Sequence, residues 1–147
     1  MCFPPLHTGL VSLNLLDLSS NLFSAVPRHL SPSVEQLYLS NNTLSALNED
    51  SFVGFFNLKY LRLSNCSLRS GVIHQKVFNF SSLVELDLSY NKLKTVPTVP
   101  TTLRYLYLEA NEIQGEVHAY TRKHANTLKN AITFQTVIAT EALTSRL

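Results

Sequence analysis

Apolar residues recur in a fixed order along the chain. The clearest copy is LVELDLSYNKL at residues 83–93, with leucine at its first, fourth, sixth and eleventh positions and asparagine at its ninth. The leucines at the fourth and sixth positions alternate with acidic residues, so they point to one side of a short strand and fill a core. The pattern therefore predicts a strand that is buried on one face and exposed on the other.

This pattern occurs five times. The copies begin at Leu13, Val34, Leu58, Leu83 and Leu103, at intervals of 20–25 residues. Such spacing is typical of the leucine-rich repeat, whose units stack into a solenoid with a ladder of parallel strands on its inner face. We predict a leucine-rich repeat solenoid at 13–114, with short parallel strands and a convex side of loops or 3-10 turns. An N-terminal partial cap at 1–12 precedes it, and a non-repeat tail at 115–147 follows.

The ninth position of the repeat is the most specific part of the pattern. An asparagine there can bond backbone groups of its own turn and of neighbouring coils. A cysteine bonds more weakly but fits the same position. An all-β sandwich or barrel would also show alternating strands, but it would not place one such residue at the same offset in every copy. The position is held by Asn21, Asn42, Cys66, Asn91 and Asn111.

The two ends of the chain depart from the repeat. Apolar residues between 126 and 143 partly fit helical spacing, while residues 133–140 are equally strand-like. We favour a helix that folds over the last coil. Since natural solenoids cover their ends with capping units, we also expect self-association through uncapped ends of the leucine core.

Composition and charge narrow the class of protein. The 147 residues are 45% hydrophobic, with a net charge of +2 and no basic run, so nucleic acid is not an expected partner. The apolar stretches are too short for a transmembrane helix. The first residues lack the basic start and continuous apolar core of a signal peptide, which suggests a cytoplasmic protein or an incomplete gene product. Cys2 and Cys66 lie two or more coils apart, about 10 Å or more, so we expect free thiols.

The residues between the leucines of each strand face the concave side of the predicted solenoid. Four of the six tyrosines of the chain fall there. Tyrosine offers a rigid ring and a hydroxyl, which suit protein recognition. We predict a ligand-binding patch on this face; the alternative is a solvated strand face with good strand propensity. The predicted patch comprises Tyr38, Tyr60, Arg62, Glu85, Asp87, Tyr105 and Tyr107.

Catalytic and metal-binding motifs are not found. The five histidines show no ligand spacing with cysteine or carboxylate. There is no glycine-rich phosphate loop and no nucleophile motif of the G-x-S-x-G type. We therefore expect neither an enzyme nor a bound metal or cofactor.

Residues 78–99, FNFSSLVELDLSYNKLKTVPTV, point to one branch of the repeat family. Together with the alternation of short and long repeats and the Val26-Pro27 and Val96-Pro97 elements, this segment resembles class II small leucine-rich repeat proteoglycans, the fibromodulin and lumican group. The resemblance runs from about Leu10 to Gln114. It implies a secreted extracellular-matrix glycoprotein that binds fibrillar collagen and influences fibril assembly.

Three sequons fit a secretory history, with acceptors Asn41, Asn65 and Asn79. In the family the third is a typical acceptor and can bear keratan sulfate; the alternative for Asn41 and Asn65 is unmodified turn residues. The family's N-terminal cysteine cluster and its C-terminal disulfide cap are missing, which suggests a truncated or variant product. The alternative function is a leucine-rich repeat receptor or adaptor fragment that binds another protein.

Overall fold

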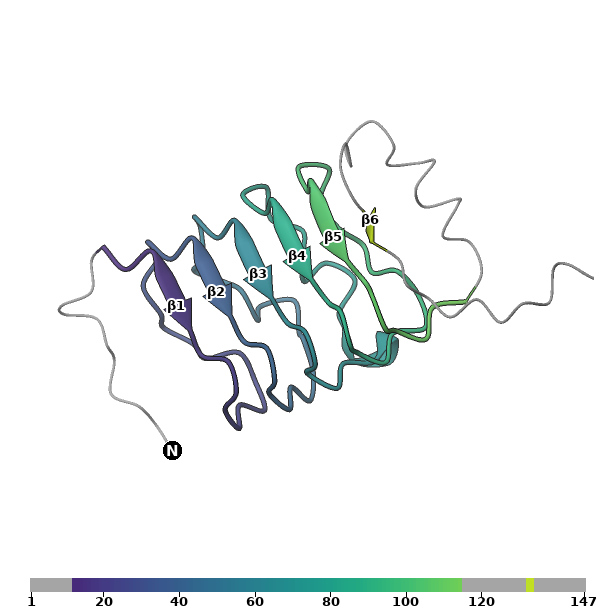
Figure 1. The fold of residues 1–147 in the computed structure, drawn as a ribbon. Helices are drawn as coiled ribbons and strands as arrows, with labels where there is room; N and C mark the ends of the chain where they lie inside the picture. Colours follow the sequence, from purple (N-terminus) through teal and green to yellow (C-terminus); the bar gives the residue numbers. More distant parts are fainter. Residues whose placement is uncertain (1–11, 115–131, 134–147) are drawn as a thin grey trace, which may run out of the picture.

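The described part of the chain is a stack of coils joined by one parallel sheet. The computed structural model describes residues 12–114 and 132–133. The strands follow one another in chain order across the sheet (Figure 1). They are β1 (Leu15–Asp17), β2 (Gln36–Tyr38), β3 (Tyr60–Arg62), β4 (Glu85–Asp87), β5 (Tyr105–Tyr107) and β6 (Ile132–Thr133). A 3-10 helix, η1 (Ser70–Val72), lies in the third coil. The predicted leucine-rich repeat solenoid is confirmed.

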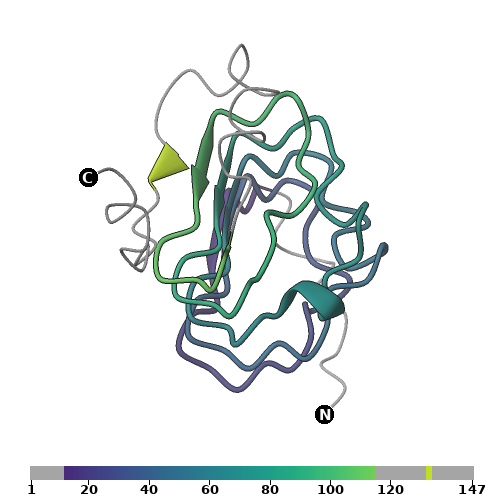
Figure 2. The same cartoon turned by 90° about the vertical axis from the view of Figure 1, so that its right-hand side faces the viewer.

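Equivalent repeat positions pair in register. Leu37 of β2 faces Leu16 of β1 on one side and Leu61 of β3 on the other, and Leu86 and Leu106 continue the row. The side chains of Leu37, Leu61, Leu86 and Leu106 are fully buried. Figure 2 looks along the stack, where successive coils lie behind one another around a common interior. Each buried leucine contributes about 1.5–3 kcal/mol relative to an exposed one, so the ladder of leucines sets the register.

Aromatic residues fill the core behind the longer coils. Phe52 of the second coil stacks on Phe78 of the third, with 6.2 Å between ring centroids. Phe55 and Phe80 pack against the ring of Phe52, at centroid distances of 6.2 and 6.0 Å. Rings at these separations interact favourably beyond their burial. The larger side chains therefore fill the volume that the extra residues of the longer coils enclose.

The asparagine at the ninth repeat position bonds backbone groups of two coils, as expected. The side-chain Nδ2 of Asn91 donates to the carbonyls of Leu88 and Leu63 at 2.9 and 2.8 Å. Its Oδ1 accepts from the backbone N–H groups of Cys66 and Leu68 at 3.0 Å. Buried polar groups of the turn are thus paired inside the solenoid.

Cys66 takes the asparagine position in the third coil, also as expected. Its thiol is free and fully buried, and Sγ donates to the carbonyl of Leu39 at 3.1 Å. Burial raises the pKa of the thiol. The other cysteine of the chain, Cys2, lies outside the described residues.

The tail gives one correction. The helix expected over 126–143 is wrong at Ile132 and Thr133, which form β6 and pair in parallel with β5. Both residues are β-branched and favour extended backbone, and the edge of β5 offers unpaired hydrogen-bonding groups. The remainder of the tail and residues 1–11 of the expected N-terminal cap lie outside the described residues. Self-association through the ends stays a prediction.

Candidate concave binding face

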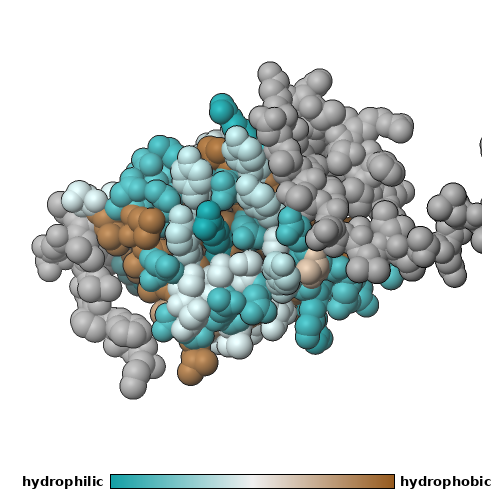
Figure 3. Space-filling view, in the orientation of Figure 1, coloured by the Kyte–Doolittle hydropathy of each residue, from teal (hydrophilic) through white to brown (hydrophobic). Residues whose placement is uncertain are grey.

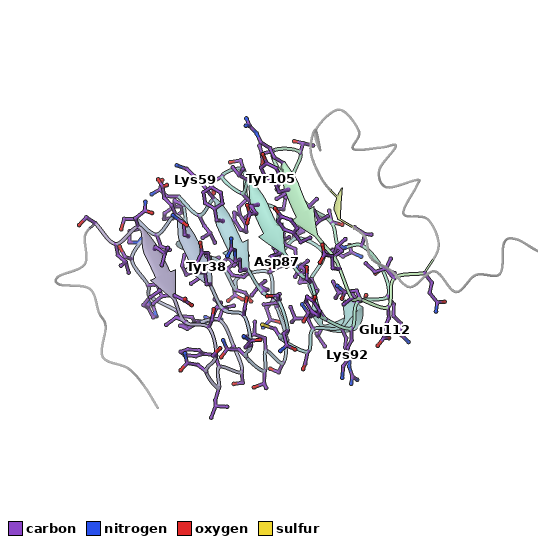
Figure 4. The ribbon with its side chains drawn as sticks, viewed as in Figure 1. Tyr38, Lys59, Asp87, Lys92, Tyr105 and Glu112 are labelled. Carbon is purple, nitrogen blue, oxygen red and sulfur yellow. The ribbon has the colours of Figure 1, made fainter. Side chains whose placement is uncertain are left out.

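The register of the sheet brings the predicted patch together. One row across the strands runs through Gln36, Tyr60, Glu85 and Tyr105, and the next runs through Tyr38, Arg62, Asp87 and Tyr107. All seven predicted residues therefore lie side by side on the concave face. Figure 4 shows the labelled Tyr38, Asp87 and Tyr105 along three of these strands. Six of the seven residues are half-buried, and Arg62 is exposed.

Arg62 bridges two neighbouring strands. Its guanidinium carbon lies 4.6 Å from the centroid of the Tyr38 ring. Its Nη2 is 3.6 Å from Oε1 of Glu85. The guanidinium thus contacts an aromatic ring on one neighbouring strand and a carboxylate on the other. Because the arginine side chain is 47% exposed, the ion pair contributes about 0–1 kcal/mol.

Asp87 has a local backbone role that sequence reasoning missed. One of its carboxylate oxygens, Oδ1, accepts the N–H of Ser89 at 2.9 Å. Asp17 makes the same bond to Ser19 at 2.9 Å, and this bond lowers the pKa of Asp17. Aspartate two residues before the donor forms an Asx-turn. The repeated Asp-x-Ser spacing was the signal that could have revealed it.

A hollow of about 250 Å³ lies over the C-terminal ends of β3, β4 and β5. The lining includes four residues that were not in the predicted patch. Three of them, Ser64, Ser89 and Glu109, lie two positions after the last residue of a strand. The hydroxyl of Tyr107, which lines the hollow, has a raised pKa. The main cause is burial, and the second is the negative charge of Glu85. The lining residues are Arg62, Ser64, Glu85, Asp87, Ser89, Tyr90, Tyr107 and Glu109.

Figure 3 shows a mixed surface on the strand side, with hydrophobic residues gathered toward the β1 end. Leu15 of β1 is 44% exposed there. At the upper edge of β2 and β3, Lys59 pairs with Glu35 at 2.9 Å, and this bond lowers the pKa of Glu35. The face therefore combines Leu15 and Asp17 at β1 with a denser group of charged residues over β3–β5.

The three sequon asparagines are exposed. Asn41 and Asn65 both have positive φ, at 57° and 51°. Asparagine tolerates this conformation better than most residues. The geometry of the turn is therefore enough to explain why asparagine occupies these two positions, whether or not it is glycosylated. Asn79 lies directly after the buried Phe78 and has ordinary φ.

No cluster of three or more metal-ligating side chains is present in residues 12–114 or at 132–133. Nor does this part of the chain contain a helix long and apolar enough to cross a membrane.

Comparison with known proteins agrees with the geometry. Leucine rich repeat family models match residues 11–68, 57–80 and 82–101. Mouse lumican is 49% identical over 106 residues, which are 72% of this chain and 31% of lumican. Rabbit lumican is 52% identical over 101 residues, and bovine fibromodulin is 48% identical over 105 residues, which cover 28% of its length. The chain thus spans about a third of the mouse and bovine relatives.

The solenoid and its family-model matches define a leucine-rich repeat protein. Within that class, the identity to lumican and fibromodulin over nearly three quarters of the chain is decisive. The chain belongs to the small leucine-rich repeat proteoglycans of the lumican and fibromodulin group.

Proposed function

We propose that this chain acts in the extracellular matrix, where it binds fibrillar collagen through its concave face and modulates fibril assembly. The observation that carries the proposal is the continuous row of tyrosine and charged side chains across β2–β5. The similarity to lumican and fibromodulin supports it. The proposed role is recognition and not catalysis.

The chemistry of the face suits a protein ligand. Tyr38, Tyr60, Tyr105 and Tyr107 are half-buried, so their rings are held by neighbours while one side stays accessible. The hydroxyl of Tyr38 donates to Oε1 of Gln36 at 2.9 Å, which orients that ring further. Rigid rings lose little conformational entropy on binding, which favours association. The face is therefore organised before a partner arrives.

Secretion and glycosylation form the second part of the proposal. The exposed acceptors Asn41, Asn65 and Asn79 support it. In a secreted chain, N-x-S/T asparagines on the surface are substrates for N-glycosylation. From the family resemblance, we propose Asn79 as the site of keratan sulfate.

A collagen fibrillogenesis assay tests the function. Collagen turbidity is followed with the wild-type chain, with a Tyr38→Ala/Tyr105→Ala double variant, and with Arg28→Ala as control. Arg28 is exposed and pairs with Asp50 away from the strands. We expect the wild type and the control to change the lag time and final turbidity equally, and the tyrosine variant to lose the effect. No effect of the wild type would overturn the proposal and favour another protein ligand.

A further inference from the structure

The hollow over β3–β5 has an excess of negative charge. Its lining contains three carboxylates, those of Glu85, Asp87 and Glu109, against the single guanidinium of Arg62. Arg62 is already engaged by Glu85 at 3.6 Å and by the ring of Tyr38. Neither Asp87 nor Glu109 forms a salt bridge with any described residue. Two carboxylates therefore face the hollow without a cation.

An independent feature points to a ligand at the same place. Ser89 lines the hollow and is only 5% exposed, yet within the described range its hydrogen bonds are all made by its backbone and not by its hydroxyl. The equivalent Ser64, one coil away, donates to Oγ of Ser40 at 2.8 Å. A buried hydroxyl without a partner destabilises the fold. The unpaired group at the hollow therefore offers a bond that the chain itself does not use.

We propose that this hollow holds a basic side chain, lysine or arginine, of the protein partner; with collagen as that partner, the inference rests on the proposed function. The cation would donate to the carboxylates of Asp87 and Glu109 and to Oγ of Ser89. Asp87 has an oxygen available, because only Oδ1 is bonded to the N–H of Ser89. The apolar stem of the basic side chain would lie against the ring of Tyr107. A neutral side chain would leave the carboxylates unpaired.

Short peptides test the pocket without collagen. The ¹⁵N-labelled chain is titrated with acetyl-Gly-Lys-Gly-amide and acetyl-Gly-Arg-Gly-amide, with the glutamine peptide as control. We expect the amide signals of Ser89, Tyr107 and Glu109 to shift with the basic peptides and to stay in place with the neutral one. Equal shifts with all three peptides, or no shifts with any, would overturn the proposal.

Isosteric variants test it with collagen. Asp87→Asn keeps the Oδ1 acceptor for Ser89 but removes the charge, and Glu109→Gln removes the second one. Both are made in bacteria, because Asp87→Asn creates a new N-x-S sequon with Ser89. We expect each to weaken collagen binding by on the order of tenfold and to reduce its dependence on salt. Glu112→Gln, an exposed acid outside the hollow, is the matched control and should bind like the wild type.

Ser89→Ala separates binding from folding. Since the hydroxyl is buried and unpaired, its removal should leave the unfolding midpoint unchanged or raised, while binding of collagen and of the basic peptides falls. If the wild type binds collagen and each of the three variants Ser89→Ala, Asp87→Asn and Glu109→Gln binds it with the same affinity, the pocket is overturned and the collagen function is not. Peptide binding without collagen binding would instead support the pocket and overturn the collagen function alone.

Discussion

The side-chain Nδ2 of Asn65 donates a hydrogen bond to Oδ1 of Asn41 in the preceding coil, at a distance of 2.9 Å. Both residues are sequon acceptors, both are exposed and both occupy the left-handed region. An N-glycan is attached at Nδ2, the atom that forms this contact. Two sequons that are 24 residues apart in sequence thus have their acceptors side by side in the fold.

This proximity predicts how many glycans a secreted chain carries. We expect glycosylation at Asn79 and at one of the pair Asn41 and Asn65, because a glycan on either member crowds the other. Asn41→Gln or Asn65→Gln alone should then leave the number of glycans unchanged, and the double variant should lose one. Masses before and after glycosidase treatment of chains secreted from animal cells, behind an added signal peptide, provide the count. Loss of one glycan in each single variant would contradict this expectation.

Replacing Cys66 by asparagine should stabilise the fold. The backbone N–H groups of Phe23 and Leu93 each donate at 3.0 Å to the asparagine Oδ1 of the next coil. The equivalent N–H, on the buried Leu44, has no hydrogen bond within the described residues, and Cys66 holds the asparagine position of the next coil. An oxygen there should add about 1 kcal/mol to the free energy of unfolding, measured by urea denaturation. The reciprocal Asn91→Cys should lower it by about 2 kcal/mol or more, since two accepted bonds and at least one donated bond are lost.

Backbone strain at the turn after each strand predicts a second stabilising change. Ser20, Asn41, Asn65, Tyr90 and Ala110 occupy the same repeat position and have φ of 51–57°. Ala110 is exposed, so Ala110→Gly should relieve the left-handed strain and gain about 1 kcal/mol without loss of packing.

The control for this change is Ala25→Gly. Ala25 is also exposed but does not have positive φ, so glycine there should cost about 0.5–1 kcal/mol. Thermal unfolding of both variants measures the difference in sign. A destabilised Ala110→Gly would show that the strain is not relieved.

Two raised pKa values predict loss of stability in alkali. Burial raises the pKa of Cys66 above its ordinary 9.0 and that of Tyr107 above its ordinary 10.0. The folded state then keeps these protons to higher pH than the unfolded chain, so stability is full below the ordinary values and falls as pH rises through the folded ones. Denaturation from about pH 7 to about pH 10.5 measures the fall. Cys66→Ala should show a smaller fall, and an unchanged slope would exclude Cys66 as a cause.

The repeat pattern predicted those parts of the fold that depend on neighbouring repeat positions. The burial of Leu37 and Leu61, the role of Asn91 and the alignment of the tyrosines all follow once each coil sits in register on the last. The strand pairing of Ile132 and Thr133 could not be predicted from the repeat pattern, because the tail sequence does not contain the repeat. Its apolar residues fit helical and strand spacing equally.

The detailed site was less predictable. The hollow arises where the side chains of three coils meet, and its shape depends on rotamers that a single-coil pattern does not specify. The preference of Arg62 for Glu85 and the unpaired hydroxyl of Ser89 are both of this kind. The Asx-turn of Asp87 could have been predicted from the Asp-x-Ser spacing, because an aspartate two residues before an N–H donor favours such a turn.

A glycan placed on the concave face tests collagen binding by that face most directly. Tyr38→Asn creates an N-x-S acceptor with Ser40 at the β2 end of the row, and Glu49→Asn creates one with Ser51, outside the strands, where the side chain of Glu49 is 62% exposed. Binding of each glycosylated chain to immobilised triple-helical collagen is measured by surface plasmon resonance. We predict that the glycan from Tyr38→Asn abolishes binding and that the one from Glu49→Asn leaves it at the wild-type level. Wild-type binding by the glycosylated Tyr38→Asn chain would contradict the concave face as the collagen site.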